Sequence, residues 1–281
     1  MTIDETLRAA ADYLRDAGIE SARIDAELLL GHVLQMSRVE MLAHSTDAVD
    51  ESPAAAMRSL LERRGRDREP VPYLIGHTEF YGLPFLVNAG VLIPRPSTET
   101  LVGIAVERLG AGGLAADIGT GSGAIAVSIA RLTPARVVAT DISDAALAVA
   151  ASNALLHGVE ARVRFLRGDL LEPLAGAAEP FDLIASNPPY IAADELGSLM
   201  PELRHEPREA LCDEADGYRL LKTLVEGAPR FLRPGGALLL EVGVKQAGPV
   251  RQLALYHGAY GDVKVWKDLD GIDRVIEATH K

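Results

Sequence analysis

The chain has 281 residues, of which 48% are hydrophobic and 24% are charged. These proportions are typical of soluble globular proteins and argue against a disordered, collagen-like or coiled-coil chain. The formal net charge of -12 would repel a polyanion, so the composition disfavours nucleic acid as a partner. The single cysteine, Cys212, excludes an internal disulfide. We therefore expect a reducing compartment and no structural metal.

The N-terminal sequence differs from an export signal. Asp4 and Glu5 stand where a secretion signal needs Lys or Arg followed by an apolar run. The most apolar later window, 113–130, contains Asp117 and several glycines instead of the roughly 20 consecutive apolar residues of a membrane span. We expect a cytoplasmic protein that does not enter a membrane.

Residues 1–70 are expected to form a small helical bundle. Thr2 and Glu5 fit a capping box at the start of the first helix, and apolar residues recur at helical spacing after it. The bundle ends in a basic cluster at 63–68. A solvated helix end is the favoured interpretation of this cluster, and a nucleic-acid-binding surface is the alternative.

Residues 71–96 are expected to be a β-hairpin linker, because prolines punctuate β-prone segments there. From 97 to 281, apolar strand-like segments alternate with helical ones, which is typical of a parallel sheet with helices on both faces. Strands are predicted at Leu114–Ile118, Val137–Thr140, Val163–Leu166, Phe181–Ser186 and Ala237–Val242. The segments 263–266 and 274–277 flank an Asp-Leu-Asp-Gly turn and predict an antiparallel hairpin at the sheet edge.

A glycine-rich loop lies between an apolar strand and an apolar helix. Its residues are Asp117, Ile118, Gly119, Thr120, Gly121, Ser122 and Gly123. The glycines permit a tight turn and a close approach of a ligand to the backbone, and the helix start supplies free N–H groups. The loop therefore indicates a nucleotide-type cofactor. It does not choose the cofactor, because it also satisfies the GxGxxG/A pattern of dinucleotide folds.

Two carboxylates follow the next two strands. Asp141 can accept both hydroxyl hydrogens of a ribose, which suits NAD and S-adenosylmethionine equally. Capping the helix that starts near Ser143 is the alternative role for Asp141. Asp169 can meet the exocyclic amine of an adenine and Leu170 can cover its face, although Gly-Asp turns are common.

The segment Asn187-Pro188-Pro189-Tyr190 follows the fourth strand, at the carboxyl edge where open α/β sheets bind ligands. It suits a planar NH2 group. The Asn187 oxygen can accept one N–H, a backbone carbonyl held by the prolines can accept the other, and Tyr190 can stack on the plane. An amide nitrogen is a weak nucleophile, so positioning must supply most of the catalysis of a methyl transfer. A simple Asn-Pro-Pro turn is the alternative.

The glycine loop, Asp141 and the Asn-Pro-Pro-Tyr segment resemble those of class I S-adenosylmethionine-dependent methyltransferases, in the branch that methylates planar amino or amide nitrogens. More specifically, the chain is similar to the bacterial protein-(glutamine-N5) methyltransferases of the HemK/PrmC family. The segments that carry this likeness are 72–82, 92–99, 205–211 and 268–275. The resemblance spans essentially the full chain and implies a Rossmann-like α/β domain at 97–281 with a small N-terminal helical bundle.

The resemblance also implies a function. Members of the family methylate the glutamine of the GGQ motif in class-1 peptide chain release factors, and S-adenosyl-L-methionine becomes S-adenosyl-L-homocysteine. By matching position, the cofactor residues are Asp117, Gly119, Thr120, Gly121, Ser122, Gly123, Asp141, Asp169, Leu170 and Asn187. The substrate glutamine is held by Asn187, Pro188, Pro189 and Tyr190, of which Asn187, Pro188 and Tyr190 are the catalytic residues. Residues 1–70 then recognise the release factor.

Three other functions remain open from the sequence. A methyltransferase acting on a flipped adenine or cytosine uses the same Asn-Pro-Pro-Tyr geometry, and it predicts a basic groove. An NAD-dependent dehydrogenase fits the glycine loop but has no use for the Asn-Pro-Pro-Tyr segment. A non-enzymatic protein of the same fold would bind the cofactor and modify nothing.

Overall fold

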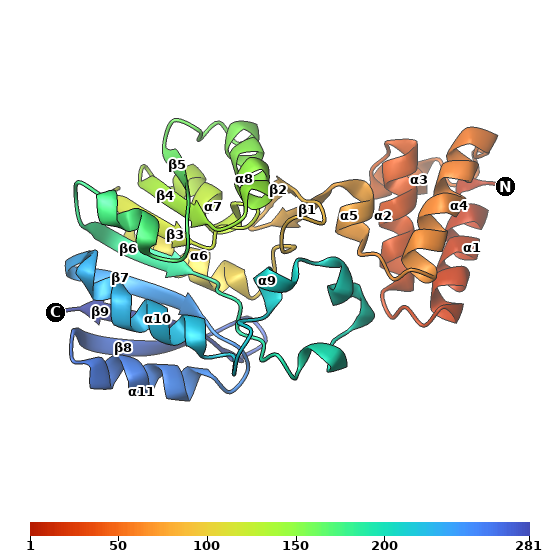
Figure 1. Cartoon of the computed structure of the whole chain (residues 1–281). Helices are drawn as coiled ribbons and strands as arrows, with labels where there is room; N and C mark the ends of the chain where they lie inside the picture. The colour runs from red at the N-terminus through yellow and green to blue at the C-terminus, as the bar shows by residue number, and fades with distance from the viewer. The chain divides into compact units, whose positions relative to one another are not determined.

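The computed structural model describes residues 1–281, which form two compact units (Figure 1). The first unit comprises Met1–His77 together with Met200–His205. The second comprises Thr78–Leu199 and Glu206–Lys281. No helix of either unit is both long enough and apolar enough to cross a membrane.

The first unit is helical, as predicted for residues 1–70, but it also includes a short helix at 71–75, where the sequence predicted the start of a β-hairpin linker. Its helices are α1 (Ile3–Asp16), α2 (Ala22–Leu34), α3 (Arg38–Ala43), α4 (Glu51–Gly65) and α5 (Val71–Ile75). The predicted capping box is present, because Thr2 Oγ1 accepts from the Glu5 N–H and the Glu5 carboxylate accepts from the Thr2 N–H. Leu14, Leu29 and Met57 are buried and join α1, α2 and α4 in one apolar core.

The basic cluster at 63–68 is not a fully solvated helix end. Arg64 is only 6% exposed, and its guanidinium donates to Asp25 at 2.7 Å and to Glu202 at 2.8 Å. Arg68 also pairs with Glu202, at 2.8 Å. Glu202 lies in the short segment that returns to the first unit, so buried ion pairs tie that segment to the helices.

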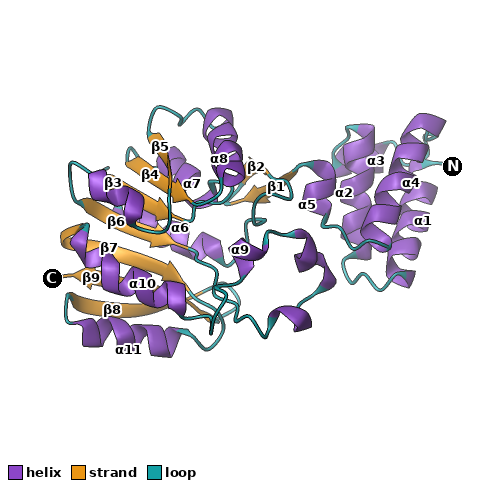
Figure 2. Cartoon of the chain, in the orientation of Figure 1, coloured by secondary structure: helices purple, strands orange, loops and turns teal.

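The second unit is built on a seven-stranded sheet (Figure 2). Its strands are β3 (Leu114–Ile118), β4 (Arg136–Asp141), β5 (Val163–Arg167), β6 (Phe181–Ser186), β7 (Leu232–Glu241), β8 (Tyr260–Lys267) and β9 (Asp273–His280). They lie in the order β5-β4-β3-β6-β7-β9-β8, with β3 to β7 parallel. Strand β9 is antiparallel to β7 and β8, which confirms the predicted edge hairpin. A separate two-stranded sheet precedes this one, with strands β1 (His77–Phe80) and β2 (Leu83–Leu86).

Helices cover both faces of the sheet. They are α6 (Thr98–Arg108), α7 (Ala124–Leu132), α8 (Asp144–Leu156), α10 (Arg219–Gly227) and α11 (Ala247–His257). A single-turn helix, α9 (Arg208–Leu211), lies in the long connection between β6 and α10. Alternate strand residues enter different cores: Leu183 packs in the core that contains α6 and α7, whereas Ile184 packs in the core that contains α10 and α11. The predicted α/β fold class is therefore confirmed.

The strand order places a switch point between β3 and β6. From β3 the chain moves to β4 on one side, and after β5 it returns to β6 on the other side of β3. The loops that leave β3 and β6 diverge there, and open α/β sheets bind ligands in the crevice that such divergence leaves.

Candidate active site at the carboxyl edge of the sheet

The glycine loop leaves β3 at this switch point in a conformation that requires glycine. Gly119, Gly121 and Gly123 have φ values of 71°, 55° and 82°. At Gly123 a Cβ would also lie 3.0 Å from the Ala150 Cβ of α8. Gly123 immediately precedes α7, and its lack of a side chain allows the start of α7 to pack closely against α8.

Asp117 holds this loop in place through hydrogen bonds. It is fully buried, and its Oδ2 accepts from the Thr120 hydroxyl at 2.6 Å and from the Ala126 N–H at 3.1 Å. Its Oδ1 has no hydrogen-bond partner. Burial raises the pKa of Asp117 to about 7, with a further contribution from the charge of Asp141, against the two hydrogen bonds.

Asp141 joins the loop to the end of β4. Its Oδ2 accepts from the Gly121 N–H at 2.8 Å and its Oδ1 accepts from the Ser143 N–H at 2.9 Å. The N-cap of α8 is Ser143, whose hydroxyl accepts from the Ala146 N–H. Asp141 therefore is not the capping residue of α8, and its half-buried carboxylate lies beside the loop. Burial raises its pKa.

A cavity of about 310 Å³ opens at this edge of the sheet. Its volume lies at the lower end of the range of small-molecule sites, about 300 to 1,000 Å³. The predicted residues that line it are Gly119, Thr120, Gly121, Ser122, Asp141, Asp169, Leu170, Asn187 and Pro189. The other predicted residues, Asp117, Gly123, Pro188 and Tyr190, are not among the residues that line it.

The loop after β6 brings Asn187 to the cavity. The buried Ser186 hydroxyl donates to the Ile118 carbonyl of β3 at 2.7 Å, so the two strand ends stay in register. Asn187 Nδ2 donates to Thr98 Oγ1 at 3.2 Å, so Thr98 engages the nitrogen of the Asn187 carboxamide and not its Oδ1. Further along, the Tyr190 carbonyl accepts from Gln246 Nε2 at 3.1 Å, and burial raises the pKa of the Tyr190 hydroxyl.

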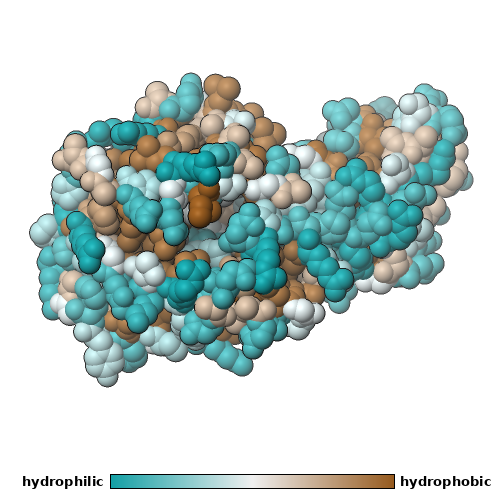
Figure 3. Space-filling view, in the orientation of Figure 1, coloured by the Kyte–Doolittle hydropathy of each residue, from teal (hydrophilic) through white to brown (hydrophobic).

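Sequence reasoning missed part of the cavity wall. Thr98 at the start of α6 and the segment around α9, with Glu209 and Cys212, also line it. The segments 92–99 and 205–211 carry part of the family resemblance, which was the only signal in the sequence that pointed to them. On the face drawn in Figure 3, hydrophobic residues of the second unit are interspersed with hydrophilic ones, so surface hydropathy alone does not mark the site.

The side chains at this edge form a consistent chemical set. A carboxylate beside a glycine loop suits a nucleoside, and the carboxamide of Asn187 lies on the same cavity wall. A carboxamide can bind a second planar amide or amine by hydrogen bonds in its plane. The cavity therefore can bring a nucleoside-containing cofactor and a planar nitrogen group together.

Comparison with known proteins agrees with this arrangement. A family model described as the PrmC N-terminal domain matches residues 5–76, and one described as a methyltransferase small domain matches residues 96–214. A crystal structure of a methyltransferase from Pyrococcus furiosus superposes with a TM-score of 0.53 at 21% identity, over 71% of this chain and 90% of that chain. This likeness concerns the fold alone.

Two curated relatives are similar over nearly their full length. The release factor glutamine methyltransferase of Moorella thermoacetica is 43% identical over 99% of this chain and 98% of its own length. The release factor glutamine methyltransferase of Bordetella pertussis is 48% identical over 94% of this chain and 96% of its own length. Because both identities extend over nearly the whole chain, the protein described here belongs to the family of release factor glutamine methyltransferases.

Proposed function

We propose that this chain transfers a methyl group from S-adenosyl-L-methionine to the side-chain nitrogen, N5, of the glutamine in the GGQ motif of class-1 peptide chain release factors. The observation that carries the proposal is the position of Asn187, which lines the same cavity as the glycine loop and Asp141. Family membership supports the choice of a release factor glutamine as the acceptor.

The residues at the cavity fit the proposed cofactor. The positive φ values of Gly119 and Gly121 leave the loop backbone accessible, and a Cβ at either position would meet no atom within 4 Å, so the space above the loop is open. Asp141 would hold the ribose hydroxyls, while Asp169 and Leu170 would contact the adenine. When bound, S-adenosyl-L-methionine supplies an electrophilic methyl group on a sulfonium.

The chain itself contributes mainly orientation to the reaction. Asn187 Oδ1 accepts one N–H of the substrate amide, and a backbone carbonyl of the Pro188–Pro189 segment accepts the other. The two hydrogen bonds fix the plane of the amide and direct the face of its nitrogen into the cavity, while Tyr190 stacks on the plane. Holding reacting groups in line at about 3 to 3.5 Å supplies much of the rate of such reactions. The proton leaves the cationic nitrogen to water.

The partner in this proposal is the release factor, which residues 1–70 recognise, and the reaction takes place in the cytoplasm. Direct contact with nucleic acid is not part of the proposal. The basic cluster at 63–68 gives little support to the alternative of a DNA-binding surface, because its arginines are paired with carboxylates. These pairs are Arg63 with Glu69, Arg64 with Asp25 and Glu202, Arg66 with Asp67, and Arg68 with Glu202.

The Asn187→Ala variant tests the proposal. We expect turnover on a release factor to fall by at least about a hundredfold, the scale seen when a positioning hydrogen-bond group is removed, because the substrate amide loses its in-plane acceptor. Affinity for S-adenosyl-L-methionine should stay within about tenfold, since the loop and Asp141 remain. Turnover near that of the wild type would show that Asn187 does not hold the substrate.

A further inference from the structure

The Asn-Pro-Pro-Tyr segment at 187–190 cannot be fixed by a regular backbone ladder. Its two prolines have no N–H group, so they donate no hydrogen bond to a neighbouring strand or loop. Just before the segment, the Ser186 hydroxyl donates to the Ile118 carbonyl at 2.7 Å. At its other end, the Tyr190 carbonyl accepts from Gln246 Nε2 at 3.1 Å. These two contacts hold the segment at its two ends.

Gln246, the residue before α11, bonds to three different loops. Its side chain is buried, and its Oε1 accepts from the Gly243 N–H at 2.8 Å. Its Nε2 donates to the Tyr190 carbonyl and, at 3.0 Å, to the Gly217 carbonyl. A carboxamide has two donors on its nitrogen and an acceptor oxygen, so only one orientation of this side chain satisfies one N–H group and two carbonyls. The three hydrogen bonds therefore hold the Gln246 carboxamide in a single position.

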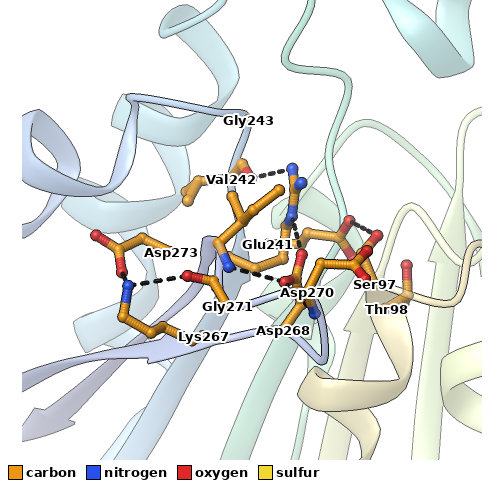
Figure 4. A network of polar contacts seen from close by, with 12 residues as sticks. Ser97, Thr98, Glu241, Val242, Gly243, Lys267, Asp268, Asp270, Gly271 and Asp273 are labelled. Carbon is orange, nitrogen blue, oxygen red and sulfur yellow. Dashed lines mark hydrogen bonds and ion pairs between the residues drawn. The ribbon is translucent and has the colours of Figure 1, made fainter.

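The acceptor side of this carboxamide is tied to the sheet. Gly243 lies two residues after the end of β7, and Val242 stands between them (Figure 4). The Val242 N–H donates to the carbonyl of Arg274 in β9 at 2.9 Å, and the Val242 carbonyl accepts from the Arg274 guanidinium at 3.2 Å. Gln246 therefore connects a part of the backbone that the sheet holds to the end of the Asn-Pro-Pro-Tyr segment.

Close packing at two glycines leaves little room for this arrangement to shift. A Cβ at Gly217 would lie 2.6 Å from the Tyr190 carbonyl oxygen and 3.0 Å from Gln246 Nε2. A Cβ at Gly243 would lie 2.9 Å from Gln246 Oε1 and 3.0 Å from Cδ2 of the Tyr190 ring. All four distances are shorter than ordinary contacts between heavy atoms, about 3.5 to 4.0 Å. The backbone at both glycines is therefore packed directly against Tyr190 and Gln246.

The same contacts join two segments of the cavity wall. Asn187 and Pro189 line the cavity, and so does Cys212 in the loop that leads to Gly217. Gln246 is not among the residues that line it. An effect of Gln246 on the reaction therefore has to pass through the segments that it holds.

From these contacts we infer that Gln246 is a positioning residue: by holding the Tyr190 carbonyl, it fixes the place of the backbone carbonyl and the aromatic ring that bind the substrate amide. The inference rests on the proposed role of the Asn-Pro-Pro-Tyr segment in holding the glutamine amide. The reaction depends on in-line placement of the amide nitrogen. Movement of this segment should therefore slow the chemical step more than it weakens binding of the release factor.

The first test is Gln246→Met in the full-length protein. Methionine has a similar length and removes all three hydrogen bonds. We expect kcat on a release factor to fall by about tenfold or more, because the Tyr190 carbonyl loses its donor. The KM for the release factor and the dissociation constant for S-adenosyl-L-methionine should change by less than about threefold, since Asp141 and the glycine loop are unchanged. Wild-type kcat in this variant would overturn the inference.

Tyr260→Phe is the matched control for the loss of a buried hydrogen bond. The Tyr260 hydroxyl donates to the Val225 carbonyl at 2.7 Å, and neither residue lines the cavity. The variant should have a lower thermal stability, with kcat within about threefold of the wild type. A merely structural role for Gln246 would give equal values of kcat in Gln246→Met and Tyr260→Phe.

Gly217→Ala disturbs the same carbonyl with Gln246 intact, so the inference stays testable if Gln246→Met does not fold. Gly235→Ala is its control, because φ is 81° at Gly217 and 79° at Gly235, but a Cβ at Gly235 would meet no atom within 4 Å. Both variants should be less stable than the wild type. We expect Gly217→Ala to lower kcat by about tenfold or more and Gly235→Ala by less than about threefold. Equal values of kcat would contradict the inference.

Asn187→Ala, measured in the same assay, separates the inference from the proposed function. If it abolishes turnover while Gln246→Met and Gly217→Ala keep wild-type kcat, the positioning role of Gln246 is wrong and the proposed function stands. If Asn187→Ala itself turns over normally, the proposed role of Asn187 is wrong, and the inference about Gln246 fails with it.

Discussion

At the scale of single residues, Asp117 is the most unusual group in the second unit. Burial raises its pKa from 3.8 to about 7, so the folded protein binds this proton more tightly than the unfolded chain does. The contribution of Asp117 to stability is therefore fully present below about pH 4 and is lost as the pH rises through about 7. At neutral pH, ionisation of the buried Asp117 carboxyl group lowers the stability of the folded protein.

The Asp117→Asn variant replaces the titratable carboxyl group with an amide that does not ionise. It keeps a side-chain oxygen that can accept from the Thr120 hydroxyl and the Ala126 N–H. Between pH 4 and 7, we expect the free energy of unfolding of the wild type to fall relative to that of the variant, by up to about 1.4 kcal/mol per pH unit. Above about pH 7 the difference should level off. Urea unfolding at a series of pH values measures this, and a pH-independent difference would rule out the raised pKa.

Asp141 is predicted to govern cofactor binding. Asp141→Ala removes the proposed acceptor for the ribose hydroxyls and the acceptor that holds the Gly121 N–H. We expect the dissociation constant for S-adenosyl-L-methionine to rise about tenfold or more, the scale of a lost hydrogen bond to a charged group, with a smaller change in kcat at saturating cofactor. Isothermal titration calorimetry measures the first quantity, and unchanged affinity would exclude the ribose role.

The residues of the site were predictable from sequence to different extents. Asp141 and Asn187 follow strands directly, and parallel strands end at one edge of a sheet, so their proximity follows from the alternating pattern. The hydrogen bond from the Ser97 hydroxyl to Glu241 could not be predicted in this way. This contact depends on where α6 begins relative to β7, which is a matter of tertiary packing that no local spacing records.

At the scale of elements, the strands were predictable and some of their ends were not. The predicted segment Leu114–Ile118 coincides with β3, because a short apolar run bounded by glycines leaves little freedom. Strand β7 begins at Leu232, five residues before the predicted start at Ala237. Phe181 pairs with Leu232 and Leu183 pairs with Ala237, so an irregularity between the two pairs accommodates residues 233–236.

The segment Met200–His205 was also beyond prediction from sequence. It belongs to the first unit although it lies more than a hundred residues from those helices. The Glu202 carboxylate pairs with Arg64 and Arg68, and the His205 ring hydrogen-bonds to the Asp67 carbonyl. Burial opposes ionisation of Glu202, but the hydrogen bond from Arg64 and the charges of Arg68 and Arg64 prevail and lower its pKa. A local pattern cannot record such a long-range pairing.

Arg64→Ala tests the importance of this ion network. Removing the buried guanidinium leaves the buried Asp25 without its ion-pair partner and Glu202 with Arg68 alone, and we expect the first unit to lose about 3 to 5 kcal/mol of stability. Hydrogen-exchange mass spectrometry of α2 and α4 measures the loss. Arg58→Ala on the same helix is the control, since its ion pair with Glu51 is exposed and should contribute about 1 kcal/mol or less. Equal effects of the two variants would contradict a structural role for the buried network.

At the scale of the whole molecule, the chain combines a helical unit matched by the PrmC N-terminal domain model with a methyltransferase unit. Its formal net charge of -12 and its paired arginines agree with a protein acceptor better than with a polyanion. Composition excluded broad classes of protein, and the strand-end motifs located the chemistry. The identity of the acceptor depended on the resemblance of the full chain to its relatives, because no single motif distinguishes a glutamine amide from a nucleobase.

The most direct measurement is the position of a transferred methyl group. The full-length protein is incubated with S-adenosyl-L-methionine carrying a deuterated methyl group and with one of three acceptors: a class-1 release factor, the same factor with its GGQ glutamine replaced by asparagine, or duplex DNA. Peptide mass spectrometry should find one labelled methyl on the side-chain amide of the GGQ glutamine and none on the other two acceptors. A label on DNA, on a different residue of the release factor, or on no acceptor despite demonstrated cofactor binding would contradict the proposed function.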